Sequence, residues 1–334
     1  MSFLLCEAKN RIGKDNQLVK LSRLLDWNRI GRKLKGIYAY DLNGKGGQKP
    51  YDSVKMFKAL LLGQWHDLSD AKLEESLRVR LDFMMFTGLE DDVPDETTLC
   101  RFRNLLISRK LDQKLFREIN RQLEKIGLKV KECSGAVVDA TVIESAARPN
   151  KSIKSVPNDR EEAPGNDAPK NEIEYSKDPD ARWLKKRKRY HFGYKAFVTT
   201  DSDDGYIENV HLTPANESEV NNLENALGNV EPERVYGDKG YASKKNREYL
   251  KSRGIKDGIL SKAARNRPLT SWEKRRNKLL SKVRFIVEQA FGTLKRRFRA
   301  GRARYIGLKK VTAEFRFKAI CFNLLKAVNK VKFA

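Results

Sequence analysis

Two short apolar runs each lead to an aspartate, and this pattern constrains the fold more than any other feature of the chain. Residues 136–138 (AVV) lead directly to Asp139, and residues 234–236 (RVY) lead through one glycine to Asp238. Short runs of this kind, bounded by glycine, are typical of buried strands. The first run therefore predicts a strand with an acid at its end, and the second predicts a strand followed by an acid in a glycine-rich turn. An aspartate that caps a turn after a strand is common, so a purely structural role stays open for each acid alone.

The segments around these acids predict a mixed sheet flanked by helices. Residues 203–205 (DDG) form a typical hairpin turn between two strands, and Gly254 is a natural residue to follow the end of a helix. The order strand, hairpin, helix, strand, helix, strand, helix matches a ribonuclease H-like α/β arrangement. After the first strand, the predicted elements are strands at 193–200 and 206–212, a helix at 218–227, a strand at 234–236, a helix at 243–253, a strand at 255–260 and a long helix at 271–298.

Residues 1–130 predict a separate, mostly helical N-terminal domain. Residues 53–66 have the apolar spacing of an amphipathic helix, Ser69 offers an N-cap for a second helix that ends near Arg80, and a third helix begins near Pro94. Three short helices with tight connections fit a helix-turn-helix DNA-binding module and equally fit any small helical bundle. We favour the DNA-binding interpretation.

Residues 131–334 then form the predicted catalytic domain, which ends in a basic helical region. Within it, residues 147–190 are rich in Pro, Asn, Asp and Lys and poor in apolar side chains. This composition predicts a mobile loop or insertion over most of the segment.

The charge of the chain points to a partner rich in phosphate. Lys and Arg number 69 against 44 acids, which gives a net charge of +25. Residues 261–334 hold 22 of these basic residues and three acids, so most of the excess lies there. The basic runs alternate with apolar residues at helical spacing, which indicates a folded basic surface rather than a tail. A phospholipid surface is a weaker alternative, because no apolar run approaches the length that spans a bilayer.

The cysteines and the N-terminal sequence predict a cytoplasmic protein. The first residues lack the basic stretch of a secretory signal. The cysteines show no paired spacing and no nearby histidine cluster, so zinc is not expected and free thiols suit a reducing cytosol. These cysteines are Cys6, Cys100, Cys133 and Cys321.

A third acid, Glu288, lies in the long predicted helix. Arg284, Glu288 and Lys295 are spaced by four and seven residues, which places them on one helical face. An adjacent apolar stripe would pack the helix on the sheet, and it comprises Val283, Val287, Ala290 and Leu294. An ordinary Arg–Glu pair on a solvated face explains the same spacing, so the pattern around Glu288 is weak when it is taken alone.

Taken together, these motifs resemble the bacterial insertion-sequence transposases with a D, D, E triad, specifically the insertion sequence 5 group. The resemblance rests on V-V-D-A-T around Asp139, Y-G-D-K-G-Y around Asp238 and R-x3-E-x6-K over residues 284–295. Further similar segments are HFGYK at 191–195, LTPAN at 212–216 and PDETTLCRFR at 94–103. The likeness extends from about Ser53 to the C-terminus, and the combined motifs are highly specific.

The resemblance implies a reaction and its metal site. Asp139, Asp238 and Glu288 would hold two Mg²⁺ ions, with Mn²⁺ as an expected substitute. Activated water would cut DNA at the terminal inverted repeats of a mobile element, and the freed 3′-hydroxyl would attack target DNA without a covalent protein–DNA intermediate. Carboxylate oxygens are the ligands that Mg²⁺ prefers, and paired ions suit phosphodiester chemistry.

The resemblance also implies DNA contacts and an assembly. Arg284 and Lys295 would contact phosphates near the scissile bond. The N-terminal helices would bind the terminal repeats or assemble a homodimer or higher oligomer on double-stranded DNA. The remaining expected DNA contacts are Lys239, Arg296, Arg297 and Lys195.

One departure and two alternatives qualify this interpretation. The related signature carries a tyrosine three residues before the arginine, where this chain has Ser281, and this puts hairpin handling at the cut end in doubt. A domesticated transposase that binds DNA without cutting it is one alternative, and a structure-selective nuclease of similar fold is another. The intact set of acids argues against the first, because like charges brought together are costly unless a metal offsets them.

Overall fold

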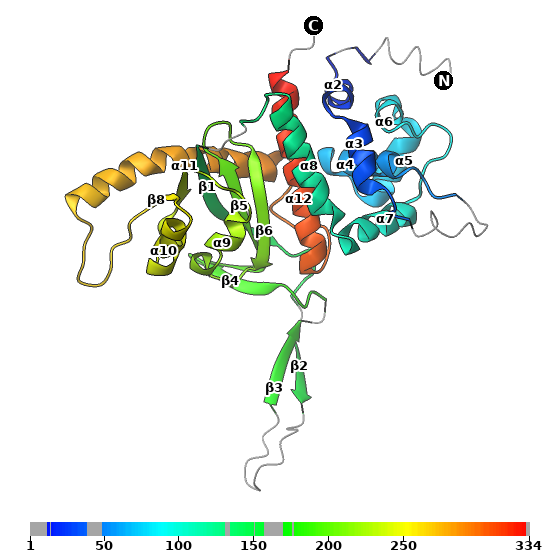
Figure 1. Cartoon of the computed structure of the whole chain (residues 1–334). Coiled ribbons are helices and arrows are strands. Elements are labelled where there is room, and N and C mark those ends of the chain that lie inside the picture. The colour runs from blue at the N-terminus through cyan, green and yellow to red at the C-terminus, as the bar shows by residue number, and fades with distance from the viewer. Residues whose placement is uncertain are drawn as a thin grey trace.

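The computed structural model describes residues 12–13, 15–38, 49–130, 134–149 and 177–331, together with the backbone of residues 151–156 and 170–175. Helices come first along the chain, and the sheet and its covering helices follow (Figure 1). In the described part, no helix is long and apolar enough to cross a membrane.

The N-terminal part is helical, as the sequence predicts. Ser69 accepts a hydrogen bond from the N–H of Lys72 at the start of one helix, and Asp95 accepts one from the N–H of Thr98 at the start of another. These side chains satisfy N–H groups that the first turn of a helix leaves without partners. The helices are α2 (Gln17–Leu24), α3 (Trp27–Leu34), α4 (Ser53–Trp65), α5 (Asp70–Val79), α6 (Leu81–Thr87), α7 (Glu96–Ser108) and α8 (Leu111–Lys125).

A mixed sheet with the order β4-β5-β1-β7-β8 forms the second part, and β6 pairs with β5. β1 runs antiparallel to β5 and parallel to β7, and β7 runs parallel to β8. This is the predicted ribonuclease H-like order, in which a hairpin strand and a later strand flank the first strand. The strands are β1 (Gly135–Glu144), β4 (Arg182–Lys186), β5 (Arg189–Asp201), β6 (Ile207–Pro214), β7 (Arg234–Gly237) and β8 (Lys256–Ile259).

Helices cover both faces of this sheet. Alternate residues of β5 enter different cores, since Ala196 and Val198 belong to one cluster and Phe197 belongs to the other. The smaller cluster lies under α9 and α10, and the larger lies under α11 and α12. The elements after β6 are η2 (Glu219–Asn221), α9 (Leu223–Leu227), η3 (Lys239–Tyr241), α10 (Lys244–Ser252), α11 (Ser271–Arg297) and α12 (Leu308–Lys330).

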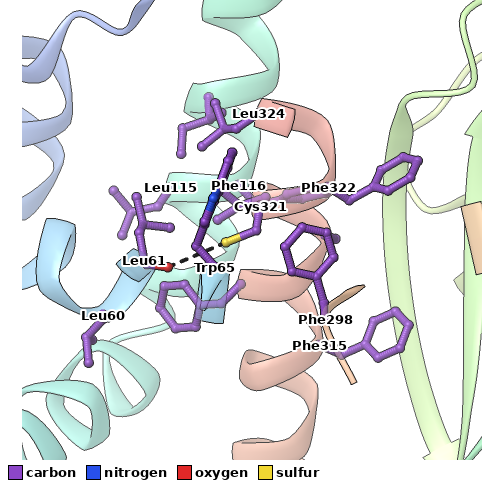
Figure 2. Close-up of a cluster of buried hydrophobic side chains, with 14 of the residues drawn as sticks. Leu60, Leu61, Trp65, Leu115, Phe116, Phe298, Phe315, Cys321, Phe322 and Leu324 are labelled. Carbon is purple, nitrogen blue, oxygen red and sulfur yellow. Dashed lines mark hydrogen bonds between the residues drawn. The ribbon is translucent and has the colours of Figure 1, made fainter. Parts of the chain in front are cut away.

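Helix α12 joins the N-terminal helices to the sheet. It packs on β6 on one side and on α4 and α8 on the other (Figure 1). Figure 2 shows the centre of this contact, where Cys321 lies beside Leu61 and Trp65 of α4 and Phe116 of α8. The larger core therefore continues across the domain boundary expected between residues 130 and 131.

The segment predicted as a mobile loop or insertion over most of residues 147–190 contains strands that its composition did not predict. β2 (Lys151–Val156) and β3 (Lys170–Tyr175) form an antiparallel hairpin that projects from the sheet (Figure 1), and β4 pairs with the start of β5 inside the main sheet. β4 lies at a sheet edge, where lysines and arginines are common because they discourage pairing with other chains. Because of this polar composition, β4 was not predicted as a strand from the sequence. Residues 150, 157–169 and 176 lie outside the described residues.

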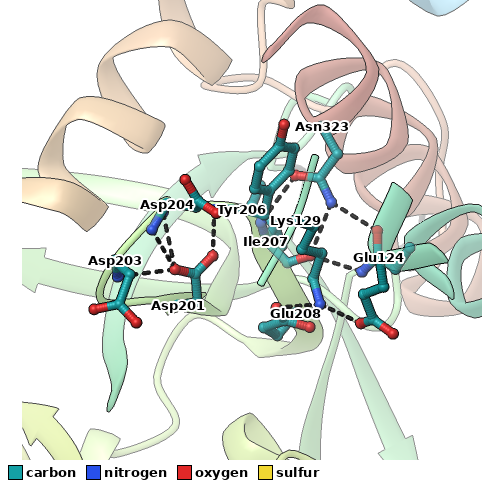
Figure 3. Close-up of polar contacts among 11 residues, drawn as sticks. Glu124, Lys129, Asp201, Asp203, Asp204, Tyr206, Ile207, Glu208 and Asn323 are labelled. Atoms are coloured by element: carbon teal, nitrogen blue, oxygen red, sulfur yellow. Dashed lines mark hydrogen bonds and ion pairs between the residues drawn. The ribbon is translucent and has the colours of Figure 1, made fainter. Parts of the chain in front are cut away.

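Buried polar side chains fasten the sheet to the helices (Figure 3). Asn323 of α12 accepts the N–H of Ile207 at 2.8 Å and donates to the carbonyl of Ile207 at 2.9 Å and to Asn120 of α8 at 2.8 Å. Beside it, Lys129 lies 2.8 Å from Glu208, and burial raises the pKa of Glu208 to about 7. Because these groups are out of water, each needs its partner in the protein.

Replacing Asn323 with leucine should lower the free energy of unfolding by about 2–4 kcal/mol, because it leaves buried groups of Ile207 and Asn120 without partners. Urea denaturation measures the change. Asn329→Leu, an exposed position on the same helix, should change the value by less than about 0.5 kcal/mol. Equal losses in the two variants would show that the Asn323 contacts do not fasten α12.

Candidate active site

The parallel pairing of β1 and β7 places Asp139 beside Asp238. The last pair in the register of β1 and β7 is Val138 with Gly237, and each aspartate is the next residue after its strand's member of this pair. Neighbouring strands lie about 4.8 Å apart, so the two acids meet at one edge of the parallel pair. Asp139 is not at the end of its strand as predicted, since β1 continues to Glu144 in antiparallel pairing with β5. Only the pairing with β7 ends there.

Local backbone contacts hold both carboxylates. Asp139 Oδ1 accepts the N–H of Ala140 at 2.8 Å. Asp238 caps η3, and its Oδ1 accepts the N–H of Lys239 at 2.7 Å. Each acid keeps a second oxygen that is available to another partner.

Arg284 of α11 lies between the two acids. Its Nη2 is 3.0 Å from Asp139 Oδ2, and its Nη1 is 3.4 Å from Asp238 Oδ1. The side chains of Arg284 and Asp139 are only 15% and 17% exposed. The Nε atom of Arg284 is buried and has no hydrogen-bond partner among the described residues. One cation therefore offsets two carboxylates, of which that of Asp139 is largely buried and that of Asp238 is 34% exposed.

Helix α11 is built to bring Arg284 to this position. Thr270 and Glu273 form a reciprocal capping box at its start. Val287, Ala290 and Leu294 are buried where α11 packs on β1, β5 and β7. These three residues belong to the apolar stripe predicted from the sequence, and that part of the prediction is confirmed.

The charge balance at Asp139 is unfavourable to its ionised form. Burial raises the pKa of Asp139, and the neighbouring Asp238 raises it further, while Arg284 and the N–H of Ala140 act in the opposite direction. Burial is the largest of these effects. A site of this kind favours additional positive charge.

Two more residues lie close to the acids and were not singled out from the sequence. Tyr241 is fully buried, and its hydroxyl has no hydrogen-bond partner in the described part of the chain. Burial raises its pKa well above the usual value, and the charges of Asp139, Glu219 and Asp238 raise it further. Burial likewise raises the pKa of Glu219. The sequence offered two weak signals for these residues. Tyr241 is the last residue of the Y-G-D-K-G-Y segment, and Glu219 is an acid shortly after the LTPAN segment.

Glu288 does not join the two aspartates in this structure. It is exposed on α11, one turn beyond Arg284. Within the described residues, no three Asp, Glu, His or Cys side chains lie close enough together to hold a metal ion. Asp139 and Asp238 nevertheless fit a divalent cation, because they present hard oxygen donors around a position that Arg284 now fills with positive charge.

The expected DNA contacts differ in their accessibility. Lys239, Lys295, Arg296 and Arg297 are all exposed. Ser281, at the position where the related signature has a tyrosine, is also exposed, and its hydroxyl donates to the carbonyl of Asn277 at 2.8 Å. These side chains lie on η3 and α11, the elements that carry or adjoin the acids.

Lys195 is buried instead of presented on the surface. Its Nζ donates to the carbonyl of Glu217 at 2.6 Å and lies 4.0 Å from Glu219 Oε1. Strand β5 is covered on both faces, so an inward lysine there is enclosed by the protein. This placement does not support the expected contact of Lys195 with DNA.

Comparison with known proteins decides the family. Residues 134–324 match the family model described as "Transposase DDE domain". The chain belongs to the DDE transposase family. Residues 6–105 of this transposase match a second family model, described as "Transposase domain (DUF772)". The enzyme is thus a polynucleotidyl transferase or endonuclease of a family that generally uses divalent metal.

A curated relative supports the same assignment. The transposase for insertion sequence element IS1106 of Neisseria meningitidis serogroup B is 47% identical over 233 residues, which cover 69% of this chain and 78% of the relative. The transposase is also similar to a piggyBac transposase synaptic complex with hairpin DNA, with a TM-score of 0.46 at 11% identity over 93% of this chain and 74% of that one. A pre-cleavage Mos1 transpososome gives a TM-score of 0.20 at 12% identity over 88% and 84% of the two chains. At these TM-scores neither structure locates individual residues.

Arg284→Met should lower the free energy of unfolding in metal-free buffer at neutral pH by about 1–3 kcal/mol, because it leaves Asp139 and Asp238 facing each other without a cation. The loss should shrink as the pH falls through the raised pKa of Asp139, since protonation removes the repulsion. Denaturation at several pH values in EDTA tests this. Arg275→Met, at an exposed position of the same helix, is the matched control. A stability loss for Arg284→Met that does not exceed that of the control would contradict the assigned balance of charge.

Proposed function

We propose that this transposase cuts DNA at terminal inverted repeats and joins the freed end to target DNA, with Mg²⁺ held by Asp139, Asp238 and Glu288. The observation that carries the proposal is the register of β1 and β7, which brings the two aspartates together around a single cation. Two Mg²⁺ ions at such a site supply a reactive nucleophile from water, neutralise the phosphate and stabilise the leaving oxygen.

The acids and Arg284 have different roles in the proposed reaction. Asp139 and Asp238 present carboxylate oxygens fixed by backbone N–H groups. Glu288 follows Arg284 by four residues and so shares its helical face, which makes it the acid of α11 best placed to complete the set. The planar guanidinium of Arg284 suits a phosphate beside the scissile bond, because it donates two parallel hydrogen bonds.

Exposed cations near the acids support a path for the DNA. Lys239 lies next to Asp238, and Lys295, Arg296 and Arg297 lie at the end of α11. We assign these side chains to phosphates on either side of the cut. We further propose that the N-terminal helices bind the terminal repeats or assemble a homodimer on double-stranded DNA.

The decisive experiment uses a labelled duplex that carries the terminal repeat of the element, with Mg²⁺ or with EDTA. Asp238→Asn should reduce cleavage on the order of 10³-fold while DNA binding is kept, because the variant loses a charged metal ligand. Glu248→Gln, an exposed acid on α10, should cut at the wild-type rate.

A negative result would favour the second candidate function. The ion pairs of Arg284 with both aspartates also suit a domesticated protein that grips DNA without cutting it. Tight binding of the repeat, with no cut or joined product under Mg²⁺ or Mn²⁺, would establish that alternative. Cleavage without strand transfer, on DNA that lacks the repeats, would instead indicate a nuclease.

Lys295→Ala should weaken DNA binding to a similar extent for all sequences and should reduce the slope of log affinity against log salt by about one, as expected for the loss of one phosphate contact. Fluorescence anisotropy at several salt concentrations measures the slope. Lys251→Ala is the control, because Lys251 is exposed in the last turn of α10 and is not among the proposed DNA contacts. If both variants keep the wild-type slope, Lys295 does not contact phosphate.

A further inference from the structure

A basic groove of about 960 Å³ lies between α10 and the connection from β8 to α11 (Figure 1). Its first side is formed by residues 242–247, which begin only four residues after Asp238, and its second side by residues 261–276 with part of β8. Its lining contains two acids and six cations, and the cations are Lys244, Arg247, Lys262, Arg265, Arg267 and Arg276.

The two acids of the groove already have partners in the protein. Asp257 pairs with Arg247 and lies 3.6 Å from Arg276, while Glu273 lies 3.5 Å from Arg267 and takes part in the capping box of α11. Burial lowers the pKa of Arg247, and the charge of Arg276 lowers it further, because the cations here are crowded together. The groove therefore keeps an excess of positive charge that suits an anionic ligand.

A tight turn presents one of the remaining cations. Ala264 and Arg267 exchange backbone hydrogen bonds of 3.1 and 3.0 Å, and Asn266 has a φ of 62°, which asparagine adopts more readily than most residues. Arg265 lies exposed at the tip of this turn. Neither Arg265 nor the nearby exposed Lys262 forms an ion pair with an acid in the described part of the chain. Both are therefore available to phosphate.

An exposed aromatic ring lines the same groove. Trp272 lies in the first turn of α11, and 69% of its surface is exposed, although a side chain of this size is usually well buried. A basic groove with an aromatic ring is the combination that binds an unpaired nucleic-acid strand, because the cations follow the phosphates while the ring stacks on a base. In a duplex, neighbouring bases cover each base face, so the ring would have no base to stack on.

Helix α11 sets the distance between the groove and the acids. Trp272 precedes Arg284 by 12 residues, which corresponds to about 18 Å at 1.5 Å per residue. At 3.4 Å per stacked nucleotide, this is the length of about five nucleotides. Lys295 lies 11 residues beyond Arg284, toward the other end of the helix. The groove is therefore separate from the DNA contacts proposed at the C-terminal end of α11.

We propose that this groove binds an unpaired DNA strand near the cut, with phosphates on Lys262 and Arg265 and one base stacked on Trp272. Unpairing a base near the scissile phosphate costs about a few kcal/mol, and stacking on an aromatic ring offsets part of this cost. The inference rests on the proposed function for its substrate, since it places the strand beside the bond that Asp139 and Asp238 would cut.

The test measures fluorescence anisotropy of the full-length protein in EDTA, with a labelled single-stranded oligothymidylate and with a duplex of equal length. Trp272→Ala should weaken binding of the single strand about 10-fold, as expected for the loss of one stacked base, and should change duplex binding less than about twofold. Trp272→Phe keeps an aromatic ring and should retain most of the affinity. Leu279→Ala removes an exposed apolar side chain of the same helix and should bind both probes as the wild type does.

Two results would overturn the inference. Trp272→Ala could bind the single strand as tightly as the wild type, which would show that the ring does not stack on a base. It could instead lose affinity equally for both probes, which would show that the groove does not distinguish an unpaired strand from a duplex. Because Trp272 is exposed, its removal should leave the core intact, and the melting temperature verifies this.

Arg265→Ala tests the phosphate contact in the same assay. It should reduce the slope of log affinity for the single strand against log salt by about 0.7, as expected for one phosphate contact with a single strand. Lys251→Ala, at an exposed position of α10 outside the groove, should keep the wild-type slope. A wild-type slope in Arg265→Ala would contradict the phosphate contact assigned to this turn.

Asp238→Asn separates the failure of this inference from that of the proposed function. It should lose cleavage and still bind the single strand as the wild type does. If Asp238→Asn stops cleavage while Trp272→Ala binds the single strand normally, only the inference about the groove fails. If Asp238→Asn cuts at the wild-type rate, the proposed catalytic role fails, and the comparison of Trp272→Ala with the wild type in EDTA still decides whether the groove binds an unpaired strand.

Discussion

The short parallel pairing between β1 and β7 is the contact on which the site depends. It aligns Val138 with Gly237, and every later feature of the site follows from the two acids that come next. A strand slipped by one residue would turn Asp139 to the opposite face and Val138 toward α11. The apolar residues of β1 prevent this slip, because Val138 enters the core under α9 and α10 while Ile143 enters the core under α11 and α12.

Helix α11 connects this register to the charge balance of the site. Its buried stripe holds it on the sheet, and the same turns of helix deliver Arg284 to the carboxylates. The position of α11 is secured in turn by α12, which packs on α11, on β6 and on the N-terminal helices. Asn323 shows how closely these parts are joined, because one buried amide contacts both the first residue of β6 and Asn120 of α8.

Local pattern in the sequence was sufficient for much of this architecture. β7, β8 and α11 lie within about two residues of their predicted bounds, since each has a short apolar run or a capped helical repeat that specifies it locally. The pairing of Arg284 with the aspartates was not predictable, because it joins residues far apart in the chain. β4 was missed because an edge strand is polar, and the extent of β1 was underestimated because Asp139 interrupts its apolar run.

The opposed charges of the surface and the site have a consequence for substrate binding under the proposed function. The chain carries a net charge of +25, yet the acids Asp139 and Asp238 lie together beside Arg284. A basic surface attracts the phosphate backbone, whereas uncompensated carboxylates repel the one phosphate that must react. Metal bound by these acids attracts the reacting phosphate instead. DNA and metal should therefore each strengthen the binding of the other at this edge of the sheet. Arg284 is the only side chain described here that pairs with both Asp139 and Asp238, and it therefore supplies the positive charge between them when metal is absent.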